Sequence, residues 1–127
     1  MPGPGRTIVY VEDEPAVRRL VEFWLLDAGY AVQLADDGAA GFELIKRVQP
    51  DVVVTDALMP VMSGDELVDA LRSDPETEHI PIIMATAAAS PLRIQRMLAR
   101  GCQAVLGKPL EEAAFLSAVR NALGQDA

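Results

Sequence analysis

The sequence predicts an α/β fold in which a central parallel sheet carries helices on both faces. Five short apolar runs alternate with five longer amphipathic segments along the chain. The run at residues 52–56 is β-branched and almost wholly apolar, which is typical of a strand buried on both faces of a parallel sheet. Strict alternation of strand and helix implies right-handed crossovers and therefore a doubly wound sheet.

Each expected strand is a short apolar run that ends near a polar or charged residue. The second strand differs from the others, because its alternating pattern predicts partial exposure to solvent. The expected strands are residues 8–11, 31–35, 52–56, 81–86 and 104–106.

Proline and glycine mark the ends of the expected helices. Pro15 and Pro91 suit the first helical position, whereas Gly29 and Gly101 suit the position after the last turn. The expected helices run from Pro15 to Gly29, from Gly38 to Pro50, from near Gly64 to Asp74, from Pro91 to Gly101, and over about residues 111–123. The wide apolar face expected on the first helix includes Val17, Leu20, Val21, Trp24 and Leu25. The apolar residues of the fourth helix are Leu92, Ile94, Met97 and Leu98.

The composition predicts one cytoplasmic domain. The chain has 127 residues, a single cysteine and a formal net charge of −8. The length fits one domain, the lone cysteine excludes an internal disulfide and fits a reducing compartment, and the negative charge disfavours direct binding to nucleic acid. No apolar stretch approaches a membrane span and the start lacks the apolar segment of a signal peptide, so we expect no membrane insertion. We expect residues 1–6 to be a flexible lead, residues 7–124 to fold, and residues 125–127 to be a tail.

Acidic and polar residues stand at the ends of four expected strands. Glu12 and Asp13 follow the first, Asp56 ends the third, Thr86 ends the fourth and Lys108 follows the fifth. The carboxyl ends of parallel strands lie along one edge of a sheet, so these side chains are expected in one pocket. Clustered carboxylates need a cation or protons between them, and oxygen-only ligands favour a hard ion such as Mg2+. Such a pocket is suited to phosphoryl transfer onto Asp56.

The same residues form four ordered motifs that resemble the receiver domains of two-component response regulators. The motifs are Glu12-Asp13, Asp56 followed by Met59-Pro60 and Gly64, Thr86-Ala87, and Lys108-Pro109. The resemblance covers essentially the whole chain and makes residues 7–124 the receiver domain. It implies a flavodoxin-like doubly wound sheet of strand order 2-1-3-4-5, with five helices on both faces.

The resemblance implies a phosphorylatable signalling switch and not an enzyme acting on a separate substrate. A histidine kinase or a histidine phosphotransfer protein would donate a phosphoryl group to Asp56. Asp13, Asp56 and the main-chain carbonyl of Leu58 would hold Mg2+. Glu12 would act on the ion through water. Catalysis would be limited to the domain's own phosphorylation and dephosphorylation.

The resemblance also implies which residues contact the phosphoryl group and which surface then binds a partner. Thr86 would hydrogen-bond to the phosphoryl oxygens and Lys108 would form an ion pair with them. A surface around the fourth helix and fifth strand would then bind a downstream protein or an output domain, and a homodimer is compatible with this arrangement. The family usually carries Tyr or Phe three residues before the lysine, whereas this chain has Val105.

Two helices carry surface features that bear on partners. Phe23 and Leu26 project away from the expected apolar face of the first helix, and we expect the phosphodonor to contact them. Arg93, Arg96 and Arg100 recur at helical spacing on the fourth helix and are expected to form a solvated basic stripe.

Three alternative functions fit the sequence less well. A phosphohydrolase of the haloacid-dehalogenase type needs a D-x-D motif after the first strand and usually a cap domain, and Glu12-Asp13-Glu14 does not supply the motif. A degenerate receiver that serves only as a scaffold stays open because of Val105. A dinucleotide site is disfavoured because Gly3-Pro4-Gly5 precedes the first strand.

Overall fold

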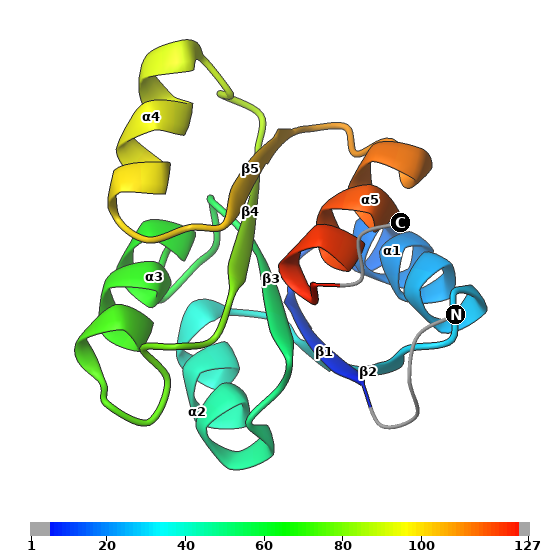
Figure 1. The fold of residues 1–127 in the computed structure, drawn as a ribbon, viewed down its shortest axis with the longest axis horizontal. Helices are drawn as coiled ribbons and strands as arrows, with labels where there is room; N and C mark the ends of the chain where they lie inside the picture. Colours follow the sequence, from blue (N-terminus) through cyan, green and yellow to red (C-terminus); the bar gives the residue numbers. More distant parts are fainter. Residues whose placement is uncertain (1–5, 125–127) are drawn as a thin grey trace.

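Residues 6–124 are the part of the chain that this computed structural model describes, and they form one parallel sheet between two layers of helices (Figure 1). The predicted tail at residues 125–127 and all but Arg6 of the predicted lead lie outside this range. The strands are β1 (Thr7–Val11), β2 (Ala31–Ala35), β3 (Val52–Asp56), β4 (Ile82–Thr86) and β5 (Ala104–Gly107). The helices are α1 (Pro15–Asp27), α2 (Gly38–Val48), α3 (Gly64–Ser73), α4 (Pro91–Ala99) and α5 (Glu112–Ala122).

The strand order is β2-β1-β3-β4-β5, which confirms the predicted doubly wound fold. The chain leaves β1 first toward β2 and later returns to the other side of β1 as β3, so the order reverses next to β1. Helices α1 and α5 cover one face of the sheet, and α2, α3 and α4 cover the other (Figure 1). Within residues 6–124, no helix combines the length and hydrophobicity that a membrane crossing requires.

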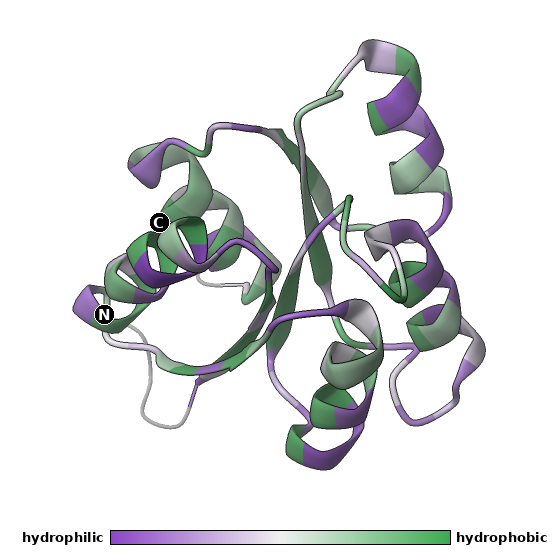
Figure 2. Cartoon of the chain, turned by 180° about the vertical axis from the view of Figure 1, so that it is seen from behind, coloured by the Kyte–Doolittle hydropathy of each residue, from purple (hydrophilic) through white to green (hydrophobic). Residues whose placement is uncertain are grey.

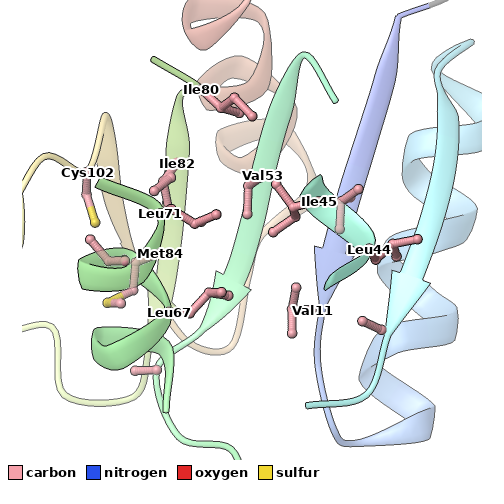
Figure 3. Close-up of a cluster of buried hydrophobic side chains, with 14 of the residues drawn as sticks. Val11, Leu44, Ile45, Val53, Leu67, Leu71, Ile80, Ile82, Met84 and Cys102 are labelled. Atoms are coloured by element: carbon pink, nitrogen blue, oxygen red, sulfur yellow. The ribbon is translucent and has the colours of Figure 1, made fainter. Parts of the chain in front are cut away.

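The sheet separates two apolar cores, because successive side chains of a strand point to opposite faces. On β1, Val9 and Val11 face the core beneath α2, α3 and α4, while Ile8 and Tyr10 face the core beneath α1 and α5. Figure 3 shows the first of these cores, in which side chains from α2 and α3 meet those of the strands. The central strands are hydrophobic along their length, whereas each helix carries both hydrophobic and hydrophilic residues (Figure 2).

Two helices bury less than the apolar pattern predicts. On α1, Val21 and Leu25 are buried, but Leu20 is 50% exposed. On α4, Met97 is the one buried residue, while the apolar Leu92 and Leu98 are both about half exposed. Helix α4 lies beside β5, the short strand at the edge of the sheet, so little of the sheet is available to cover its apolar side chains.

Ion pairs attach α4 to α3. The Arg93 guanidinium donates two hydrogen bonds of 2.7 Å to the Asp65 carboxylate, and Arg100 reaches the same carboxylate at 3.2 Å. Arg100 also lies 3.6 Å from Asp69. The prediction of a solvated basic stripe is therefore wrong for Arg93, which is partly buried in this ion pair, whereas Arg96 and Arg100 are exposed. The Arg93 hydrogen bonds, together with the Arg100 charge, hold the pKa of Asp65 below its ordinary value despite partial burial.

Asp65→Asn is expected to lower the free energy of unfolding by about 1 kcal/mol at neutral pH, because it removes a bidentate ion pair and a negative charge from the first turn of α3. The folded-state pKa of Asp65 is depressed, so its contribution is complete above the unfolded pKa of about 3.9. That contribution is lost as the pH falls through the lower folded-state pKa. Urea unfolding of both proteins at descending pH should therefore show the difference shrinking below about pH 4.

Asp69→Asn is the matched control, because Asp69 is more exposed and contacts only one of these arginines. It should change the unfolding free energy by less than Asp65→Asn. Equal effects of the two substitutions, or a difference that grows in acid, would contradict the role given to Asp65.

Candidate functional site

The parallel register aligns the carboxyl ends of the strands at one edge of the sheet. Pairs near these ends are Val11–Thr55, Asp56–Ala85 and Thr86–Gly107. Glu12 therefore follows β1 beside Asp56, and Lys108 follows β5 beside Thr86. The Lys108 N–H donates a 2.9 Å hydrogen bond to the Thr86 carbonyl oxygen, which ties these two strand ends together.

Three carboxylates meet at this edge, as the sequence predicts. Glu12, Asp13 and Asp56 each offer an oxygen, and the three oxygens lie within 4.8 Å of one another. Glu12 is 1% exposed and Asp56 is 7% exposed, whereas Asp13 is open to solvent. The site therefore contains two buried carboxylates, those of Glu12 and Asp56, and one exposed carboxylate, that of Asp13.

Lys108 supplies the positive charge that contacts the two buried carboxylates. Its ammonium group lies 3.1 Å from Glu12 Oε1 and 3.3 Å from Asp56 Oδ1. One cation thus bridges the residue after β1 and the last residue of β3, which come from distant parts of the sequence.

Burial is the largest single influence on the pKa of Glu12, Asp56 and Lys108, and charged contacts oppose it at each of them. Burial raises the pKa of Glu12, where hydrogen bonds from Glu14 and Lys108 oppose it, and the pKa of Asp56, where Lys108 opposes it. Burial would lower the pKa of Lys108, but its contacts with both carboxylates raise that pKa overall. Three carboxylates and one lysine leave an excess of negative charge, so the cluster favours a further cation.

The donor set fits a hard divalent cation. It consists of carboxylate oxygens from Glu12, Asp13 and Asp56, the ligand type that Mg2+, Ca2+ and Mn2+ prefer. The acidic cluster could therefore hold a metal ion, and such an ion would offset the cost of burying two carboxylates.

Thr86 is the last residue of β4, at the same edge of the sheet as the acidic cluster. It is 4% exposed, and its Oγ1 accepts a 3.1 Å hydrogen bond from the Ala88 N–H. The cap of α4 is Ser90, whose hydroxyl accepts from the Arg93 N–H. Thr86 is thus distinct from the helix cap and lies at the site edge.

The loop between β3 and α3 packs closely against the main chain of Asp56. A Cβ at Gly64 would overlap the Asp56 carbonyl oxygen, which explains why the predicted motif needs glycine there.

Leu58 and Val61 project outward from this loop and are 78% and 83% exposed. Met62 N–H donates to the Pro60 carbonyl oxygen at 2.7 Å, so Val61 is the centre of a γ-turn with φ of 69°.

Two residues at the site were missed by sequence reasoning. The Tyr10 hydroxyl donates to Glu12 Oε1 at 3.2 Å, and Arg18 Nη1 donates to the Glu12 carbonyl oxygen at 2.8 Å. Burial, followed by the Glu12 charge, raises the pKa of Tyr10, so the phenol stays protonated. The spacing of Tyr10 and Glu12 along one strand face was the available signal for the first contact. The Arg18 contact crosses from a helix to a loop, and no sequence pattern indicates it.

A doubly wound sheet with an acidic cluster and a lysine at its carboxyl edge is the arrangement of a phosphoacceptor signalling domain. The sequence model of the response regulator receiver domain matches residues 8–120. The chain therefore belongs to the receiver domain family of two-component systems, whose members communicate with histidine kinases and downstream effectors.

Individual relatives agree with this assignment. The chain is 40% identical over 115 residues to hybrid signal transduction histidine kinase D of Dictyostelium discoideum, a match that covers 90% of the chain. It is 33% identical to the solved chemotaxis protein CheY4 of Vibrio cholerae, with a TM-score of 0.87 over 94% of this chain and 99% of that one. It is 28% identical to the receiver domain of a Pseudomonas aeruginosa sensor histidine kinase solved with a coordinated magnesium ion, with a TM-score of 0.86 over 94% and 98% of the two chains.

Several relatives are much longer than this chain. It spans 7% of the Dictyostelium kinase, 12% of a second sensor histidine kinase and 57% of a probable transcriptional regulator. The domain thus occurs both inside large signalling proteins and as most of a chemotaxis protein.

Val61→Gly is expected to raise the free energy of unfolding by roughly 1 kcal/mol. A β-branched residue at positive φ carries strain of about 1–3 kcal/mol, and the greater chain entropy of unfolded glycine offsets about 0.5–1 kcal/mol of that gain. Val61 is exposed, so little packing is lost. Thermal or urea unfolding measures the change.

Val61→Ala is the control, since alanine keeps the Cβ that disfavours positive φ. It should gain less stability than Val61→Gly. A loss of stability in Val61→Gly would show that the loop does not store this strain.

Proposed function

We propose that residues 7–124 are a receiver domain that accepts a phosphoryl group on Asp56 and thereby switches a partner-binding surface. The observation that carries the proposal is Lys108, which contacts both Glu12 and Asp56 at the carboxyl edge of the sheet. An Asp56 oxygen would attack the phosphorus of a phosphohistidine; a P–O bond forms, the P–N bond breaks, and the imidazole leaves. Residues 1–6 and 125–127 are the proposed lead and tail.

Mg2+ is the proposed metal. Asp13, Asp56 and the main-chain carbonyl of Leu58 would hold it, with Glu12 acting through water. The ion would supply neutralisation of the charge that grows on the phosphoryl oxygens. Support comes from the oxygen-only donor set and from the magnesium ion coordinated in the Pseudomonas receiver domain.

Thr86 and Lys108 are the residues proposed to bind the oxygens of the phosphoryl group and so to respond to phosphorylation. The Thr86 hydroxyl would donate to one phosphoryl oxygen and the Lys108 ammonium would pair with another. The main-chain bond between these residues would let a shift at one strand end move the other. Val105 lies partly buried on β5, so the surface change would proceed without rotation of an aromatic ring at that position.

The proposed partners are a histidine kinase or histidine phosphotransfer protein as phosphodonor and a downstream protein or output domain as target. The proposed location is the cytoplasm, where the single cysteine would stay reduced. Catalysis would be confined to the domain's own phosphorylation and dephosphorylation. The receiver family match favours this function over a phosphohydrolase, and the complete acidic cluster with Lys108 favours it over an inert scaffold.

Phosphorylation can be tested by incubating the wild type and Asp56→Asn with Mg2+ and acetyl phosphate and measuring the masses of the products by mass spectrometry. We expect one phosphoryl adduct on the wild type, dependent on Mg2+, and none on Asp56→Asn. An adduct that survives in Asp56→Asn would assign the acceptor role to another residue. A folded wild type that forms no adduct would favour the scaffold.

Helix α1 carries the proposed docking surface for the phosphodonor. Leu20, Phe23 and Leu26 are all at least half exposed on it. An apolar cavity of about 430 Å³ beside α1 is lined by Trp24 and reaches Lys108. Exposed apolar clusters on a protein surface mark interaction sites, and Leu20 of this cluster lines the cavity that reaches Lys108.

Phe23→Asp is expected to slow phosphotransfer from a phosphorylated histidine phosphotransfer protein by about tenfold or more, because it places a charge in an apolar contact. Phosphorylation by acetyl phosphate should be unchanged. Leu98→Asp, an exposed apolar residue on α4, is the control and should leave both rates unchanged. Equal loss of both reactions in Phe23→Asp would rule out docking at this surface.

A further inference from the structure

Tyr10 is a buried tyrosine whose hydroxyl is directed at the acidic cluster. It lies on β1 and faces the core beneath α1 and α5, and Glu12 follows it by two residues, just past the end of the strand. The residue is completely buried, and its ring packs among aliphatic and aromatic side chains. Phenylalanine could fill the same space, so packing alone does not account for the hydroxyl.

The hydroxyl completes the hydrogen bonding of Glu12. Oε1 of Glu12 accepts from the Tyr10 hydroxyl at 3.2 Å and from the Lys108 ammonium at 3.1 Å. Oε2 accepts from the Glu14 N–H at 3.2 Å. Because Glu12 is 1% exposed, bulk water is poorly placed to replace a donor that is removed.

Lys108 connects this arrangement to Asp56. The same ammonium group lies 3.3 Å from Asp56 Oδ1, so a displacement of Glu12 Oε1 also displaces the cation shared with Asp56. Groups that orient the ligands of a metal site, without touching the metal, commonly change its affinity by 10–100-fold when they are removed.

We infer that Tyr10 is a positioning residue of the acidic cluster: its hydroxyl holds Glu12 Oε1 so that Lys108 lies between Glu12 and Asp56, while Asp13 and Asp56 face a divalent cation. The inference rests on the proposed function, since it requires that the cluster bind Mg2+. It adds a residue outside the four motifs, and it gives the tyrosine hydroxyl a role distinct from that of its ring.

The test is the affinity for Mg2+, measured by isothermal titration calorimetry without any phosphodonor. Tyr10→Phe keeps the ring and removes the hydroxyl, and we expect its dissociation constant to rise about tenfold. Tyr30→Phe is the matched control. Tyr30 is also buried in this core but precedes β2, at the opposite edge of the sheet, so its substitution should leave the affinity unchanged.

Glu12→Asp provides a second background that separates positioning from general destabilisation. Aspartate is one methylene shorter, so its carboxylate falls out of reach of the Tyr10 hydroxyl. In that background Tyr10→Phe should cause no further loss of affinity. Urea unfolding monitored by circular dichroism confirms that each variant is folded during the titration.

The outcomes separate this inference from the proposed function. A wild type that is folded yet binds no Mg2+ and takes no phosphoryl group contradicts the proposed function itself. A wild type that binds Mg2+, with Tyr10→Phe binding within twofold of it or more tightly, overturns only the role of Tyr10. Equal losses of affinity on Tyr10→Phe in the wild-type and Glu12→Asp backgrounds also overturn it, because Tyr10 would then act by another route.

Discussion

The repulsion among carboxylates collected at one edge of the sheet is the constraint on which the site depends. Glu12 and Asp56 are both buried, and each loses hydration that a surface carboxylate keeps. Lys108 offsets part of that cost from a distant strand end. The residual negative charge favours a cation in the pocket, and in the proposed function that cation would attract the phosphoryl group. The same few charged contacts thus bear both on the stability of the fold and on the chemistry proposed for the site.

The parallel sheet makes this collection of charges possible. Its strands share one direction, so residues separated by most of the chain length end at the same edge. The backbone bonds there, such as that between Lys108 and Thr86, fix the relative positions of the side chains. The glycine at position 64 lets the following loop lie against Asp56. The site is therefore built from strand ends and short loops on a buried scaffold.

The sequence predicts the sheet and the main site residues because both depend on local patterns. Alternating apolar runs define the strands, and the polar residue at each strand end falls at the common edge. The exposure of Leu20 and Leu92 could not be predicted, since periodicity indicates an apolar face but not how much sheet lies beneath it. The Arg93–Asp65 pair and the Tyr10–Glu12 bond depend on three-dimensional distances between side chains. The sequence shows that these four side chains are present, but only the folded structure shows that each pair is in contact.

The attachment of α4 has a consequence for its mobility. Charged pairs join it to α3, and Met97 is its one buried side chain. Detaching such a helix exposes little apolar surface, so its local opening has a lower free energy than the opening of β3 or β4. Amide hydrogens of α4 would then exchange with solvent through a local fluctuation, while those of the central strands require global unfolding. A helix held in this way can change position while Met97 is the one fully buried side chain that it moves.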